Sequence, residues 1–229
     1  FRLGVVKREQ GDRRKALNMF DKALEEDPTH QPTMQAIVEL YTNQGEWEQV
    51  VHFKRKLADT QDGPVRLQTL EEIGDLWSEK EKNPAKAIQA YREAVDLDPP
   101  NHRIHLKLLE LLTASKQWEP AIDIIEKMMD GESTPGVKAR LAYTAASILR
   151  DSVGDVDRAL EYYNRALDYS PGHLKAFEAI NRVLTTKKDW KQLERAFRKM
   201  LHRLMGQEAS GESLGEGEAK AEPEVLHSL

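Results

Sequence analysis

The segment KALNMFDKALEEDP, residues 15–28, recurs as KAIQAYREAVDLDP at 86–99 and as RALEYYNRALDYSP at 158–171. Each copy places an alanine, an aromatic residue, a second alanine and a proline at successive spacings of 4, 3 and 5 residues. Residues at these spacings share one helical face, so small side chains permit close packing and the aromatic ring fills the remaining space. The proline then ends the helix. The chain therefore contains an internal helical repeat.

Three weaker copies lie between the strong ones, with Val50, Ala121 and Leu193 in place of the first alanine. Each weaker copy has a tryptophan three residues earlier, at Trp47, Trp118 and Trp190, which we interpret as packing residues and not as base-stacking platforms. The steps between successive copies are 34, 37, 34, 38 and 34 residues. This alternation indicates a module of two repeats. We expect the longer steps to be absorbed in turns and by one extra residue inside repeats three and five.

Six helix pairs are expected from this pattern, with turns at glycine and proline residues. The first helices are predicted near 1–9, 31–44, 66–81, 103–115, 137–152 and 174–187. The second helices are predicted near 13–26, 47–59, 85–97, 119–130, 156–168 and 190–204. No segment alternates convincingly as a strand.

This helix–turn–helix unit of about 34 residues resembles the tetratricopeptide repeat. Leu3-Gly4 and Ile73-Gly74 match the Leu-Gly pair of that family, and Tyr41 and Trp77 match its next aromatic position. The resemblance implies an all-α fold, an α-solenoid superhelix of about six tetratricopeptide-like repeats over residues 1–205. The sequence departs from the family where a larger residue replaces its glycine, at Val38, Leu109, Ala146 and Asn181.

Residues 206–229 differ in composition from the repeats. They contain six glutamates and one lysine, whereas the 33 basic and 33 acidic residues of 1–205 cancel. Few of the tail residues are apolar, so we predict an acidic, Gly/Glu-rich disordered linker or tail. The chain starts without Met, and we expect it to be a fragment of a longer protein.

The composition argues against catalysis, cofactors and metal binding. There is no cysteine and no apolar run long enough to span a bilayer, and we expect a cytoplasmic protein. His102 and His105 are spaced as a metal pair, but His30, His102 and His173 all follow a repeat-ending proline, which favours a role in turns. Because no nucleophile or phosphate-binding loop accompanies the acidic helix faces, we predict that the chain is not an enzyme and has no catalytic residues.

In the resembled family, a concave groove is lined by fixed positions of the first helices. Carried over to this chain, those positions give Gln35, Glu39, Asn43, Glu71, Asp75, Glu79, Arg103, Tyr143, Arg150, Lys175 and Arg182. This groove is acidic around repeat three and basic around repeats five and six, which would orient a partner with complementary ends. The alternative is that these residues are only solvated helix faces. The Lys and Asn positions of the family's carboxylate clamp are not matched, so we reject that kind of partner.

The resemblance implies a protein–protein interaction scaffold that binds a peptide or partner protein in the groove, within a larger protein. The alternative is an RNA-binding helical-repeat module. A neutral repeat body gives no bulk attraction to phosphates or anionic lipid, so we expect neither a nucleic acid nor a membrane as partner. The oligomeric state is left open.

Overall fold

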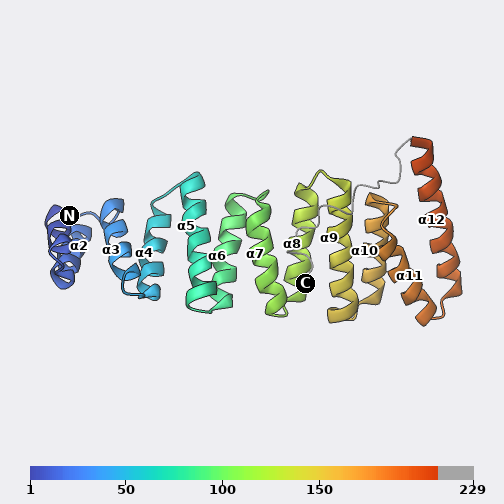
Figure 1. Cartoon of the computed structure of the whole chain (residues 1–229), viewed down its shortest axis with the longest axis horizontal. Helices are drawn as coiled ribbons and strands as arrows, with labels where there is room; N and C mark the ends of the chain where they lie inside the picture. The colour runs from blue at the N-terminus through green and yellow to red at the C-terminus, as the bar shows by residue number, and fades with distance from the viewer. Residues whose placement is uncertain (211–229) are drawn as a thin grey trace. The chain divides into compact units, whose positions relative to one another are not determined.

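The computed structural model describes residues 1–210, of which 207–210 are described only as helix, and this part of the chain folds entirely as helices and short connections (Figure 1). It divides into two compact units, Phe1–Leu111 and a second that begins at Leu112. Each unit repeats one motif, a first helix, a tight turn and a second helix packed against it. The expected all-α architecture of helix-turn-helix repeats is confirmed.

The first unit contains repeats one to three and the start of repeat four. Its helices are α1 (Arg2–Glu9), α2 (Arg13–Glu26), α3 (Gln31–Thr42), α4 (Trp47–Asp59), α5 (Gly63–Asp75), α6 (Pro84–Leu97) and the larger part of α7 (His102–Ala114). A π-helical turn, η1 (Leu76–Lys80), extends α5.

The second unit completes the array with α8 (Trp118–Gly131), α9 (Pro135–Ile148), α10 (Val156–Tyr169), α11 (Leu174–Thr186) and α12 (Trp190–Ser210). A second π-helical turn, η2 (Leu149–Val153), extends α9. The predicted and observed helix boundaries agree within about one turn, except at the end of α12. That helix continues through residues 206–210, the first five of the predicted tail, and residues 211–229 lie outside the described part of the chain.

The repeated small and aromatic residues form the seam between the two helices of a repeat. Gly4 leaves no room for a Cβ because the ring of Phe20 lies against it, and Gly74 stands in the same relation to Tyr91. Ala94 and Ala166 are fully buried, whereas the equivalent Ala23 is partly exposed. The small residues therefore permit close helix packing, as the sequence predicts, although least tightly at Ala23.

The two π-helical turns account for one inserted residue in each of repeats three and five. In repeats one, two, four and six, the residue before the second helix donates its backbone N–H to a carbonyl five residues earlier, as Glu46 does to Tyr41 at 3.1 Å. In repeats three and five the acceptor is six residues earlier, as for Asn83 and Trp77 at 2.7 Å. A π-turn accommodates one inserted residue without ending the helix. The extra residue predicted inside these two repeats is thus confirmed.

The histidines that follow the repeat-ending prolines serve mainly as helix caps. Nδ1 of His30 accepts the backbone N–H of Thr33 at 3.2 Å, and Nδ1 of His173 accepts that of Ala176 at 3.3 Å. His102 is the exposed first residue of α7, behind Asn101. These contacts confirm the predicted turn role for His30 and His173. No group of three or more His, Asp or Glu side chains within the described residues has the arrangement of a metal site.

Candidate functional site

A polar cleft of about 330 Å³ lies in the first unit, between the first helices of repeats two and three. Its rim carries three glutamine side chains, two carboxylates and one lysine, and its apolar side chains are two valines and one leucine. The lining residues are Gln35, Val38, Glu39, Lys54, Leu57, Gln61, Val65, Gln68, Thr69 and Glu72. The volume suits one or two side chains of a bound segment and not a large ligand.

The sequence explains why the cleft opens at repeat two. Counting four residues on from Val50 places Lys54 in the position that Phe20 and Tyr91 fill in repeats one and three. Val38 stands where those repeats have glycine. Repeat two thus lacks an aromatic ring at this position, and its buried ring is Phe53, one residue earlier. The flexible lysine lies at the wall of the cleft instead.

Ion pairs hold the charged groups at the rim of the cleft. Lys54 pairs with Glu72, and Gln68 donates its amide N–H to the same carboxylate at 3.0 Å. Arg8, from repeat one, pairs with Glu39. Gln35 is exposed and has no hydrogen-bond partner within residues 1–206. The rim therefore combines fixed charges with one amide that is free to bind.

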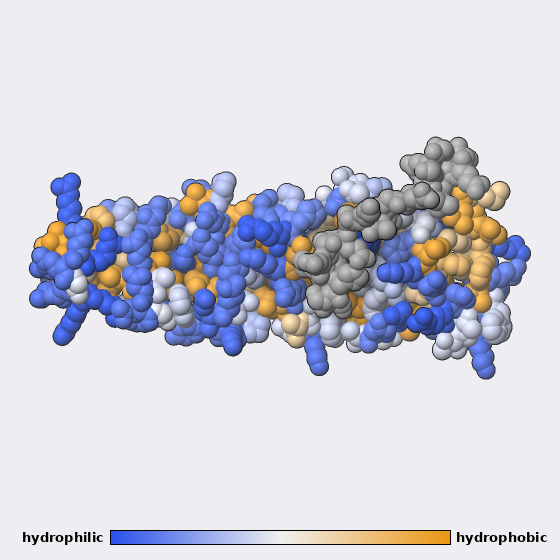
Figure 2. Space-filling model, in the orientation of Figure 1, coloured by the Kyte–Doolittle hydropathy of each residue, from blue (hydrophilic) through white to orange (hydrophobic). Residues whose placement is uncertain are grey.

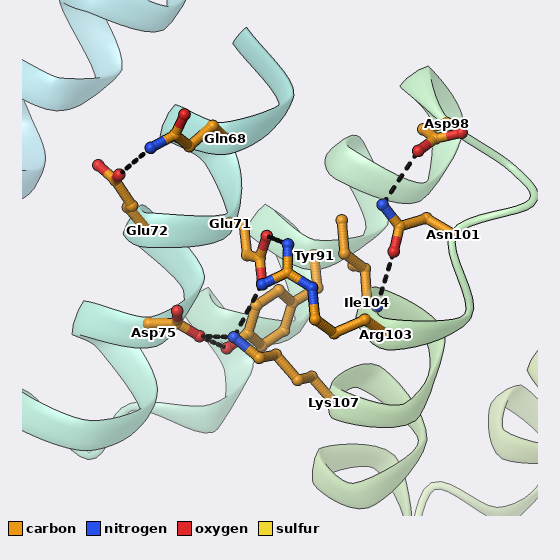
Figure 3. Close-up of polar contacts among 10 residues, drawn as sticks. All are labelled: Gln68, Glu71, Glu72, Asp75, Tyr91, Asp98, Asn101, Arg103, Ile104 and Lys107. Atoms are coloured by element: carbon orange, nitrogen blue, oxygen red, sulfur yellow. Dashed lines mark hydrogen bonds and ion pairs between the residues drawn. The ribbon is translucent and has the colours of Figure 1, made fainter. Parts of the chain in front are cut away.

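An adjacent face of α5 carries a second polar cluster, whose groups bind one another and not the cleft (Figure 3). Glu71 is only 5% exposed, and its two carboxylate oxygens accept from Arg103 at 2.6 Å and from Lys107 at 3.0 Å. Asp75 accepts from Lys107 at 2.6 Å and from the hydroxyl of Tyr91 at 2.5 Å. These contacts join repeat three to the first helix of repeat four.

The electrostatics of this cluster follow from burial and pairing. Burial and the hydrogen bond to Asp75 raise the pKa of Tyr91, so its hydroxyl remains a donor. Burial opposes the charge of Lys107, but its bonds to Asp75 and Glu71 outweigh burial and raise its pKa. The carboxylates of repeat three that sequence analysis placed in the groove are therefore largely neutralised by neighbouring cations. Glu79, farther along in η1, is exposed.

The candidate residues of the second unit group around an aromatic cluster. The ring of Tyr143 lies 5.5 Å from that of Tyr163 and 5.1 Å from that of His173, measured between centroids. Arg150 lies over the Tyr163 ring at 5.8 Å and donates two hydrogen bonds to Asp151, at 2.6 and 2.7 Å. Burial of Tyr163 raises its pKa. This cluster is a packed interface between helices with a cation at its edge.

The remaining candidates do not join either group. Asn43 is exposed beyond the last residue of α3. Lys175 and Arg182 are exposed and lie two turns apart on α11. The structure thus brings Gln35 and Glu39 together in the cleft, Glu71, Asp75 and Arg103 in the α5–α7 cluster, and Tyr143 and Arg150 around Tyr163.

Sequence reasoning missed several residues of the cleft, namely Lys54, Gln61 and Glu72. Positions of first helices alone were considered, whereas Lys54 comes from the second helix α4 and Gln61 from the following turn. A lysine in the aromatic position of repeat two was the available signal. Within the described residues, no helix is both long enough and apolar enough to cross a membrane.

Comparisons with known proteins agree with this architecture. A family model described as tetratricopeptide repeat matches residues 7–70 and 79–133, and a second with the same description matches residues 139–173. No curated protein sequence matches the chain.

Many solved structures are similar at low identity. One, described as the crystal structure of MamA, has 20% identity and a TM-score of 0.44 and covers 76% of this chain and 97% of its own. Another, YrrB, is described as a TPR protein with an unusual peptide-binding site; it has 19% identity and a TM-score of 0.41 and covers 77% of this chain and 87% of its own. The C-terminal part of a TPR repeat-containing protein from Cytophaga hutchinsonii has 14% identity and a TM-score of 0.45, with coverages of 90% and 79%.

Proposed function

Because this chain belongs to the tetratricopeptide repeat family, we propose that it is a protein-interaction scaffold whose cleft between α3 and α5 binds an extended segment of a partner protein. The observation that carries this proposal is the cleft itself. Its polar residues come largely from two successive first helices, and the packing of their repeats sets the distance between them. Recognition is then a matter of shape and hydrogen bonding and needs no reactive group.

The amide side chains define what the cleft would recognise. A glutamine both donates and accepts hydrogen bonds, so it matches the alternating N–H and C=O groups of an extended backbone. Gln35 is free to do so, and the carbonyl oxygen of Gln68 is available because only its N–H group binds Glu72. Val38, Leu57 and Val65 provide apolar contacts beside these amides.

The charges favour a basic residue in the bound segment. Of the two carboxylates in the lining, Glu72 pairs with Lys54, whereas Glu39 pairs with Arg8 but stays 64% exposed and can accept a second cation. A lysine or arginine of the partner would complement it, and an acidic residue would be repelled. The preferred ligand is therefore an extended peptide with one basic side chain flanked by small or apolar residues.

A displayed library of random peptides, selected on the full chain, tests this function. The selected peptides are expected to share a basic residue, and their affinity for the Gln35→Ala/Gln68→Ala variant should fall about tenfold, from loss of two hydrogen bonds. Gln89→Ala is the matched control because Gln89 also donates to a glutamate four residues later, Glu93, but lies outside the cleft. Equal affinity for the cleft and control variants would show that the peptides bind elsewhere.

A charge substitution tests the basic residue of the ligand. Glu39→Gln should weaken binding of the basic peptide but not of a version with its basic residue replaced by alanine, because only the former loses an attraction.

Random-sequence RNA at low salt is the competing ligand. If the chain bound that RNA tightly and in a salt-sensitive way, and the Gln35→Ala/Gln68→Ala variant did not, a nucleic-acid function would replace the peptide function.

A further inference from the structure

Helix α12 has a row of exposed hydrophobic side chains. Trp190, Phe197, Leu201 and Met205 are 60, 44, 61 and 68% exposed. Their spacings of 7, 4 and 4 residues place them on one helical face. Figure 2 shows hydrophobic residues gathered over this helix. Four large apolar residues in one row form a contiguous patch and not isolated surface residues.

The apolar row is distinct from the face by which α12 joins the array. Met200 is 6% exposed, and α12 contacts α10 and α11. Phe197 lies at the border, with its ring edge-on to that of Phe177 at 4.9 Å. The helix is thus already packed on one side, and the apolar row beside that contact has no cover within the described residues.

Cations lie along the free edge of the row. Lys191 and Arg198 each follow a residue of the row, so the helical step of about 100° places them beside it. Of the five basic residues in 190–206, Arg198 pairs with Glu194, and Lys199 and Arg203 pair with Asp168 of α10. Lys191 and Arg195 have no carboxylate partner among the described side chains. A partner for this face should therefore be apolar and acidic.

The segment directly after α12 has this composition. Residues 211–229 contain five glutamates and one lysine, a net charge of −4, and they include the adjacent apolar pair Val225-Leu226. The fifteen residues from Ser210 to Val225 reach up to about 50 Å when extended. The row from Trp190 to Met205 is only about 22 Å long at the helical rise. The segment is therefore long enough to return along the whole row.

We propose that residues 211–229 dock back on α12, with Val225-Leu226 against the apolar row and the glutamates against its basic edge. A second copy of the chain is a poorer occupant, because two α12 helices would bring their net positive charges together. Docking would cover this face of α12 with a segment of its own chain. The tail would then be a cap in place of the linker that composition alone suggests.

Disulfide trapping tests the docking directly, since the chain has no cysteine of its own. Leu226→Cys is combined with Leu201→Cys, or with Met205→Cys, in the full chain under mild oxidation. The control pair is Leu226→Cys with His202→Cys, because His202 is exposed and adjacent to Leu201 but points about 100° away. An intramolecular disulfide should form about fivefold faster or more at the apolar row than at the control, from a higher effective concentration.

The same experiment distinguishes the other occupants. Added salt should reduce the preference, because part of the attraction is between charges. Equal rates for row and control pairs at low salt overturn the proposal. Disulfides that form only between chains overturn it too, in favour of a second copy. A chain that ends at Ser210 provides the independent measurement. It should bind a dye specific for exposed apolar surface more strongly than the full chain, and no difference would contradict docking.

Discussion

Repeats two and three have the same helix pair but use one position differently. In repeat three, Tyr91 fills the seam beside Gly74 and is only 3% exposed. In repeat two, Lys54 and Val38 occupy these positions, and a polar cleft lies beside them. The difference teaches that an aromatic ring at this position fills the seam against the facing glycine, whereas Lys54 lies at the wall of an open polar cleft. A departure from the repeat pattern at one position thus marks where the packing of a repeat changes.

The largest expected effect comes from emptying the aromatic position. Tyr91→Ala should lower the free energy of unfolding by about 3–5 kcal/mol, because it leaves a cavity and removes the hydrogen bond to Asp75. Lys54→Ala should cost about 1 kcal/mol or less, since it removes only a partly exposed ion pair with Glu72. Urea unfolding followed by circular dichroism measures both. Similar losses would mean that the two repeats are packed alike.

The position that faces the aromatic one is Gly74 in repeat three and Val38 in repeat two. We expect the stability of the protein to depend strongly on side-chain size at Gly74 and weakly at Val38. Gly74→Ala adds a methyl group where the Tyr91 ring already lies, at an expected cost of about 1–3 kcal/mol. Val38→Ala removes two methyl groups from a partly exposed site and should cost less than about 1 kcal/mol. Thermal melts of the two variants compare them. A Gly74→Ala protein as stable as the parent would disprove the close contact.

The two polar faces of α5 give the third contrast. Glu71→Ala should destabilise the protein by about 1–3 kcal/mol, because Arg103 and Lys107 lose their buried acceptor. Glu72→Ala should cost about 0.5 kcal/mol, since that carboxylate is 42% exposed. Hydrogen exchange in α7 should increase for Glu71→Ala and stay unchanged for Glu72→Ala. Faster exchange in both variants would argue against a separate role for each face.

The turns provide the only expected gain in stability. Lys82 in repeat three has a φ of 49°, where repeat two has Gly45 at 70°. Lys82→Gly should stabilise by about 0.5 kcal/mol, as relief of left-handed strain slightly exceeds the added entropy of the unfolded chain. Gly45→Ala should destabilise by about 1 kcal/mol. A shift in the same direction for both variants, seen in urea midpoints, would refute this account of the turns.

Most of the fold could be predicted from the sequence because its pattern is repeated. Three strong copies fixed the frame, so helix boundaries, the histidine turns and the inserted residues of repeats three and five followed from spacing alone. The end of α12 was placed too early because the composition of residues 206–210 resembles the tail more than a helix.

The candidate site could be predicted only in part. Helical spacing identifies which residues share a face, and Gln35 and Glu39 follow from it. It does not show which charges a neighbouring repeat will neutralise. Glu71 was assigned to a binding surface, yet its burial depends on Arg103 and Lys107, more than thirty residues away in sequence. Such contacts depend on how successive repeats pack, so they cannot be predicted from the sequence pattern of one repeat.

The π-turns of η1 and η2 have a further consequence for how such a chain can grow. Each places an inserted residue at the end of a first helix and leaves the hydrogen-bonded start of the second helix unchanged, at Asn83 and at Asp155. A module of two repeats that carries its own inserted residue can therefore recur along the chain without changing how its second helices begin.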